Sequence, residues 1–199
     1  MPEKSDTHPL PSALKQIAVT LRLTGWIGFW VQLVLAVVSS LILLFAILLA
    51  GRPAPVNGTI AVNNTGPGTG GGAFFAVCGL FVLYFSIYQA FRCTRIARRL
   101  QDPNPNLRPK KADTIKFLRF GLIVSLVGML LGVLAAESIT GTLLGKSLAQ
   151  PQSLYNPAIN LRELIQPLDI FVVLANTHTI AAHFAGIAAG LWLLNRLTR

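Results

Sequence analysis

The chain has 199 residues, of which 53% are hydrophobic and 12% are charged, and its mean hydropathy is +0.60. This composition is typical of a membrane protein with several spans and argues against a soluble globular domain. The formal net charge of +10 would indicate a nucleic-acid partner in a soluble protein. Here, however, the basic residues cluster at the ends of hydrophobic segments, where they set topology and contact anionic lipid headgroups, so no nucleic-acid partner is expected.

Residues 1–24 form a polar tail that becomes weakly amphipathic towards its end. Leu14, Ile17 and Leu21 share one helical face, and Lys15 and Arg22 lie off it. This pattern predicts a short helix that lies in the membrane interface. The tail contains acidic residues and has no cleavage pattern, so we expect neither a signal peptide nor a plastid transit peptide.

Four hydrophobic runs of spanning length then define one transmembrane domain over residues 25–199. The predicted fold class is all-α, a polytopic membrane protein with four transmembrane helices, at residues 25–50, 73–91, 117–136 and 168–194. A Gly-rich loop at 51–72 separates the first two spans, and a basic loop at 92–116 separates the second from the third. A further short interfacial helix is predicted at 157–165.

Lysine and arginine residues are unevenly divided between the two sides that four spans create. Fourteen lie in the N-terminal tail, around the basic loop and at the C-terminus, against three in the other two connections. This positive-inside bias predicts that both termini and the basic loop are inside. Five basic residues are predicted to contact anionic headgroups at that surface: Arg92, Arg95, Arg99, Lys110 and Lys111.

Small residues recur along one face of each of the last two spans. They are Gly121, Ser125, Gly128 and Gly132 in the third span, and Gly186 and Gly190 in the fourth. Because lipid provides no hydrophobic driving force between helices, such faces let backbones approach closely and gain dispersion contacts. We therefore predict that the third and fourth spans form a tightly packed pair.

A polar stripe of Asn176, Thr179 and His183 crosses the fourth span near the membrane midplane. Polar groups at this depth cost free energy unless neighbouring helices cover them or they line a wet cavity. His183 and His178 are candidate metal ligands, but their spacing puts them about 140° apart, so one helix cannot offer both to one ion. The alternative is that each imidazole simply hydrogen-bonds a neighbouring helix.

Motifs for catalysis are missing from the chain. There is no nucleophile–base pairing, phosphate-binding loop or haem motif, and Cys78 and Cys93 form no CxxC. Glu137 is interpreted as an interfacial carboxylate, with a functional role as the alternative. We therefore expect no enzyme and no cofactor.

Three stretches resemble a cyanobacterial and plastid family of four-span membrane proteins: FGLIVSLVGMLLGVLAAES at 120–138, GTLLGKSLAQ at 141–150 and ANTHTIAAHFAGIAAG at 175–190. This family includes the chloroplast inner-envelope protein called permease in chloroplasts, also described as a translocon component. The resemblance implies iron permeation or participation in protein import. Because the chain has no long transit extension, we expect a cyanobacterial relative in the plasma or thylakoid membrane, and a plastid envelope protein if the source is eukaryotic.

Two functions follow as hypotheses. The first is a permease- or channel-like protein for iron or another metal cation, acting as a homo-oligomer because four helices alone enclose little space. The alternative is a non-transporting assembly, scaffold or translocon-like subunit that uses its small-residue faces to hold a larger membrane complex.

Overall fold

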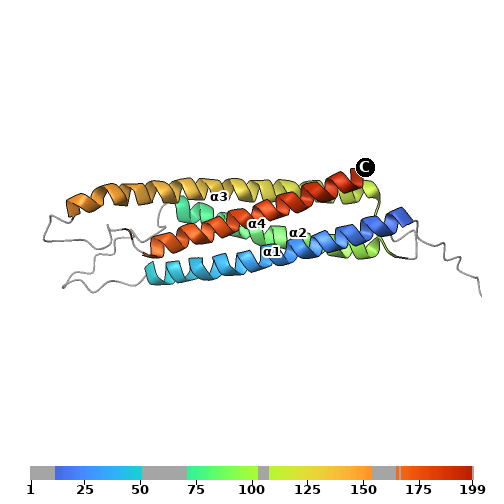
Figure 1. Ribbon diagram of the computed structural model, residues 1–199, viewed down its shortest axis with the longest axis horizontal. Helices are drawn as coiled ribbons and strands as arrows, with labels where there is room; N and C mark the ends of the chain where they lie inside the picture. The colour runs from blue at the N-terminus through green and yellow to red at the C-terminus, as the bar shows by residue number, and fades with distance from the viewer. Residues whose placement is uncertain (1–11, 51–70, 103–107, 154–164, 166, 199) are drawn as a thin grey trace, which may run out of the picture.

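The computed structural model describes residues 12–50, 71–102, 108–153, 165 and 167–198. Within these ranges the chain forms four long α-helices and no strand: α1 Ser12–Ala50, α2 Gly71–Arg99, α3 Lys111–Ser153 and α4 Pro167–Thr198 (Figure 1). Each helix contains an apolar stretch long enough to cross a membrane. The predicted all-α fold class with four spans is therefore confirmed.

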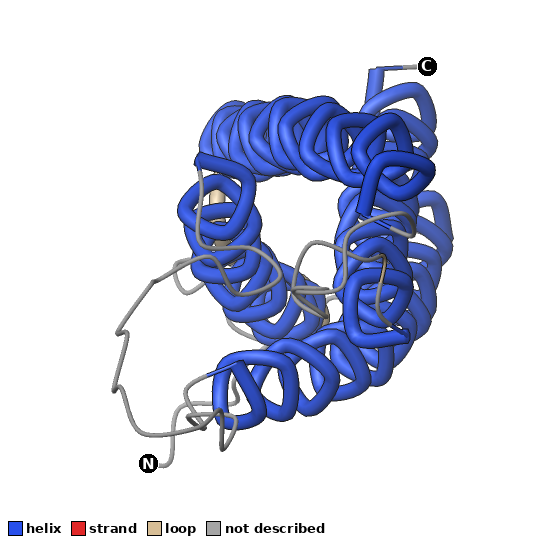
Figure 2. The backbone as a smooth tube through the Cα atoms, turned by 90° about the vertical axis from the view of Figure 1, so that its left-hand side faces the viewer, coloured by secondary structure: helices blue, strands red, loops and turns tan. Residues whose placement is uncertain are grey.

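The helices run alternately in opposite directions around a common axis (Figures 1 and 2). α1 packs against α2 and α4, and α3 packs against the same two helices, so the predicted α3–α4 pair is one of four comparable interfaces. The start of α1, the end of α2, the start of α3 and the end of α4 lie together, at the right of Figure 1. We call this end, where the arginines of α2 gather, the basic end, and the opposite end the far end.

The N-terminal amphipathic segment does not form a separate interfacial helix. It continues without a break into the first span, so that α1 is a single helix from Ser12 to Ala50. Ala18 and Leu21 are buried against residues of the other helices, including Ala97 of α2 and Leu197 of α4. This burial, together with the absence of proline from α1, explains why the helix continues through the predicted boundary at residue 24.

The other helices also extend past their predicted ends. The basic loop is shorter than expected, because residues 92–99 are the last turns of α2 and residues 111–116 the first turns of α3. α3 continues beyond residue 136 and ends at Ser153. Within this extension, the Lys146 ammonium contacts both carboxylate oxygens of Asp169 at 2.9–3.0 Å, which ties the extension to α4. The interfacial helix predicted at 157–165 lies, except for residue 165, outside the described residues.

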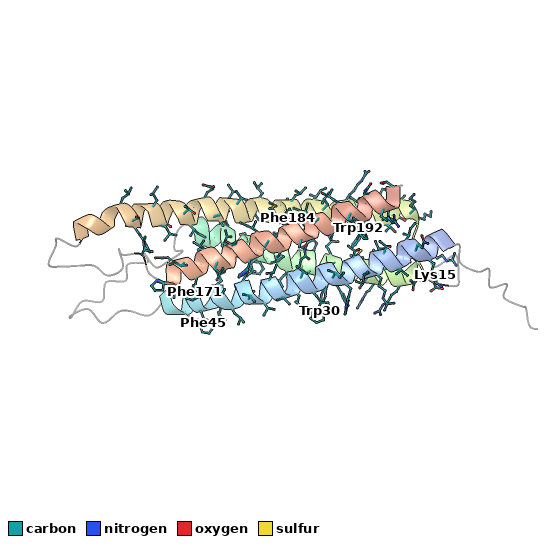
Figure 3. All side chains as sticks on the ribbon, viewed as in Figure 1. Lys15, Trp30, Phe45, Phe171, Phe184 and Trp192 are labelled. Carbon is teal, nitrogen blue, oxygen red and sulfur yellow. The ribbon has the colours of Figure 1, made fainter. Side chains whose placement is uncertain are left out.

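The outward faces of the bundle are apolar. Large side chains point away from the axis on every side, among them Trp30, Phe45, Phe171, Phe184 and Trp192, each about half exposed (Figure 3). Such a surface would promote aggregation in water, but it suits contact with acyl chains. Together with the four apolar helices, it identifies a multi-pass membrane protein.

Buried apolar side chains form three clusters along the bundle axis. The basic-end cluster contains Ala18, Leu21, Cys93, Ala97, Leu100, Leu118, Leu193 and Leu197. The middle cluster contains Ala36, Leu83, Ile87 and Ala182. The far-end cluster contains Ala46, Ala76, Ala135, Ile139 and Val172. The interior between successive clusters is polar, and these gaps hold the candidate site.

The orientation in the membrane can be tested with single cysteines in a chain whose Cys78 and Cys93 are replaced by alanine. Because the basic residues favour the inner side, an impermeant thiol reagent added to intact cells should label Ser147→Cys at the far end and leave Lys110→Cys unlabelled. Both should react after permeabilisation. Labelling of Lys110→Cys alone in intact cells would show that the basic end faces outward and would contradict the predicted topology.

Candidate functional site

The first polar layer ties all four helices together between the basic-end and middle clusters. Gln32 Nε2 of α1 donates to Ser86 Oγ of α2 at 3.1 Å and to the Ala182 carbonyl oxygen of α4 at 3.3 Å. Ser86 Oγ lies 3.1 Å from Ser125 Oγ of α3. Gly186 of α4 makes room for this layer, because a Cβ there would collide with Gln32 Nε2 and lie 2.9 Å from Ser125 Oγ.

The second polar layer lies between the middle and far-end clusters. Ser39 Oγ of α1 and Thr179 Oγ1 of α4 both donate to the Ala175 carbonyl oxygen, at 2.9 and 3.1 Å. Asn176 Nδ2 donates to the Gly132 carbonyl oxygen of α3 at 2.9 Å. Because a carbonyl oxygen can only accept, the amide atom that faces it must be the nitrogen. This bond therefore fixes the orientation of the Asn176 amide, and Oδ1 is the amide atom that does not face Gly132.

His183 lies between the two layers and is fully buried. Its Nε2 is 3.2 Å from the Gly79 carbonyl oxygen of α2. Because that oxygen can only accept, Nε2 carries the hydrogen, and Nδ1 of the neutral ring is left as an acceptor. The ring packs directly on Gly128 of α3, where an added Cβ would overlap it. His183 thus joins three helices at the centre of the bundle.

Four buried polar atoms have no hydrogen-bond partner among the described residues. They are Gln89 Oε1, Asn176 Oδ1, His178 Nδ1 and His183 Nδ1. Leaving such an atom unsatisfied costs about 1–3 kcal/mol, and lipid offers no compensation. The unsatisfied atoms are therefore places where water or a solute would be stabilised.

Two cavities adjoin two of these residues, Gln89 and Asn176. The larger, of about 70 Å³, is lined by residues of all four helices, including Gln32, Ser86, Gln89 and Ser125, and none of its lining residues is charged. The smaller, of about 10 Å³, is lined by Ser39, Asn176, Thr179 and four apolar residues. Since one water needs roughly 10–15 Å³, the larger cavity has room for several and the smaller for one at most.

The two cavities are separate. His183 lines neither of them. Both His183 and Leu83 of the middle cluster are fully buried. The polar stripe predicted on α4 thus faces the bundle interior, with Asn176, Thr179 and His183 all buried.

The small-residue faces also turn inward, but they serve two purposes. A Cβ added at Gly132 would lie 2.7 Å from Ile180 Cγ1, and one added at Gly190 would lie 3.6 Å from Leu122 Cδ1, so these glycines allow α3 and α4 to approach. Gly121 differs, since a Cβ there would meet nothing within 4 Å. Gly121 borders the larger cavity and leaves space instead of allowing close packing.

The remaining predicted residues are His178, the other candidate metal ligand, and the basic residues of the membrane surface. His178 is half-buried, and no group of three or more His, Cys, Asp or Glu side chains suited to a metal ion occurs in the described ranges. Arg92, Arg95, Arg99, Lys110 and Lys111 are exposed around the basic end. Sequence reasoning missed Gln32, Ser39, Ser86 and Gln89, whose only signal was that each interrupts an apolar span.

A four-helix membrane bundle with a polar, cavity-containing interior is therefore the class of protein that the fold and site define. The chain belongs to the family described as "protein of unknown function (DUF3611)", which matches residues 11–198. It is also 29% identical, over 200 residues and 98% of its length, to "Protein TIC 21, chloroplastic" of Arabidopsis thaliana, and it spans 62% of that relative's length. No solved structure matches the chain. The resemblance to the plastid family is confirmed.

The fit of His183 against Gly128 gives a stability prediction. Gly128→Ala should lower the free energy of unfolding by about 1–3 kcal/mol, because the new methyl group forces the imidazole away from Gly79. The measurement is thermal unfolding in detergent. Gly121→Ala, on the same helix but facing open space, is the matched control and should not destabilise the protein. Equal melting temperatures for the two variants would show that the His183 contact is not tight.

Proposed function

We propose that this protein is a permease that moves a small metal cation, iron or another, along the axis of its own four-helix bundle. The observation that carries the proposal is the series of unsatisfied atoms, Gln89 Oε1, His183 Nδ1 and Asn176 Oδ1, at successive levels of the axis. All three are lone-pair acceptors. They suit a cation or an O–H donor, and they would repel an anion.

The ligand types fit a transition metal better than an alkali ion. Imidazole nitrogen suits iron, nickel, copper and zinc, while amide oxygens replace part of a hydration shell. One free acceptor at each level provides weak binding, which conduction requires because the ion must also leave. Because each level offers one ligand, this kind of transport does not need a metal centre with several ligands, and none occurs among the described residues.

Transport on this proposal requires the helices to rearrange. The basic-end and far-end clusters lie towards the two ends of the axis, and the fully buried His183 lines neither cavity. Passage of a cation therefore requires the imidazole ring to move away from Gly128. As the ring moves, its free Nδ1 can ligate the cation. We propose His183 as the central gate of the route.

We propose that this activity takes place in a cyanobacterial plasma or thylakoid membrane, or in a plastid envelope. The relative named as chloroplastic supports the plastid location. Both cavities are lined by residues of a single chain. Self-association, or assembly with other membrane subunits, remains a proposal for the outward faces.

A second candidate is the non-transporting scaffold, and one observation favours it. The far-end extension of α3 exposes Leu144 and Leu148 by 60% and 69%, and Cβ atoms added at Gly141 and Gly145 would meet nothing within 4 Å. A partner helix could pack closely there. This candidate predicts no transport by the purified protein.

Uptake of Fe²⁺ or Co²⁺ into proteoliposomes that contain a metal-quenched dye tests the proposal. His183→Leu keeps an apolar ring-sized volume but removes the acceptor, so uptake should fall about tenfold or more, as expected for losing one polar contact to a charge. Thr177→Val is the matched control, because it removes a hydroxyl from an exposed position of the same helix, and it should transport normally. Uptake no faster than in protein-free vesicles, or equal uptake by His183→Leu, would overturn the proposal.

A further inference from the structure

We propose that the outer seam between α2 and α3 at the basic end is a binding site for one anionic phospholipid, with Arg92 holding the headgroup phosphate. This site is local and stoichiometric, which distinguishes it from the general attraction of basic residues to a charged membrane. It does not depend on the transport proposal.

Arg92 is held in place by rings from two helices. Its Cζ lies 5.9 Å from the ring centroid of Tyr88 on α2 and 5.5 Å from that of Phe117 on α3. Contacts of the guanidinium with aromatic rings restrict its position and leave N–H donors free for a phosphate. No carboxylate pairs with Arg92 within the described residues, so its charge is available. Arg92 thus forms a preorganised anion contact.

An exposed aromatic strip continues from Arg92 towards the membrane interior. Phe85, Tyr88 and Arg92 follow one face of α2 at spacings of three and four residues, a rise of about 10 Å. The Phe85 ring lies 6.4 Å from that of Tyr88 and 6.3 Å, edge-on, from that of Phe120 on α3. All three rings are about half exposed. Their apolar surface suits an acyl chain that descends from a headgroup at Arg92.

The surrounding charges favour a lipid with a net negative charge. Lys116 and Arg119 are exposed on α3 on either side of Phe117, and Arg95 and Arg99 are exposed further along α2. A zwitterionic headgroup brings its own cation into this positive field, whereas phosphatidylglycerol does not. A soluble phosphate would match Arg92 but would gain nothing from the aromatic strip. The combination therefore points to an anionic phospholipid.

Arg95 provides a matched comparison on the same helix. It is exposed like Arg92, but among the described residues it stacks only on Phe91 of its own helix, with its Cζ 4.8 Å from the ring centroid, and not on a ring of α3. Removal of either arginine changes the net charge equally. A localised site predicts different effects of the two changes, and diffuse attraction predicts the same effect.

Native mass spectrometry of detergent-purified protein, with added phosphatidylglycerol or phosphatidylcholine, tests the site. The unaltered protein should retain one phosphatidylglycerol molecule in preference to phosphatidylcholine. Arg92→Gln should weaken that binding about tenfold, since it removes a charge-assisted contact to phosphate, while Arg95→Gln should weaken it by no more than about threefold. Phe117→Leu, which keeps every charge, should also weaken retention, and glycerol phosphate without acyl chains should not compete.

Equal retention by Arg92→Gln and the unaltered protein would overturn the proposal. So would equal losses for Arg92→Gln and Arg95→Gln, because they would indicate diffuse electrostatic attraction. Competition by glycerol phosphate would show an anion site without a lipid component. Because Arg92 is exposed, its substitution should leave the fold unchanged. Circular dichroism of each variant checks that the helices are intact.

Discussion

Polar groups inside a membrane bundle must find partners on neighbouring helices, because lipid offers none. Here this requirement is met chiefly by contacts between side chains and the carbonyl groups of α2, α3 and α4. Gln32 bonds Ser86 and the Ala182 carbonyl, Asn176 bonds the Gly132 carbonyl, and His183 bonds the Gly79 carbonyl. Slipping any helix along its axis would break one of these bonds, so they set the register that apolar packing alone leaves undetermined.

Alternation of apolar clusters and polar layers also accounts for the cavities. Short residues permit the close approach that these hydrogen bonds require, as Gly128 does for His183 and Gly186 does for Gln32. Where a glycine faces no large side chain, as at Gly121, space remains and becomes part of the larger cavity. Glycine therefore allows close helix packing at some levels of the bundle and leaves open space at others.

The four spans could be predicted from sequence because hydropathy summed over some twenty residues is a strong signal. Helix ends were less predictable, because residues 12–24 and 137–153 are less apolar than the spans they extend. Contacts such as Lys146 with Asp169 hold the α3 extension to α4. On α4, the interior face could be read from the spacing of Asn176, Thr179 and His183. The residues that bond to that face could not be predicted, because Gln32, Gly79 and Gly132 come from other helices. A pattern within one helix does not report the register between helices.

The central claim is that the unsatisfied acceptors along the axis are sites for water or a permeating cation and not merely imperfect packing. A crystal structure in lipid, at a resolution that shows ordered water, tests this most directly. We expect density within hydrogen-bonding distance of Gln89 Oε1 in the larger cavity and of Asn176 Oδ1 in the smaller one. Dry cavities, with both amide oxygens paired to protein donors instead, would contradict it.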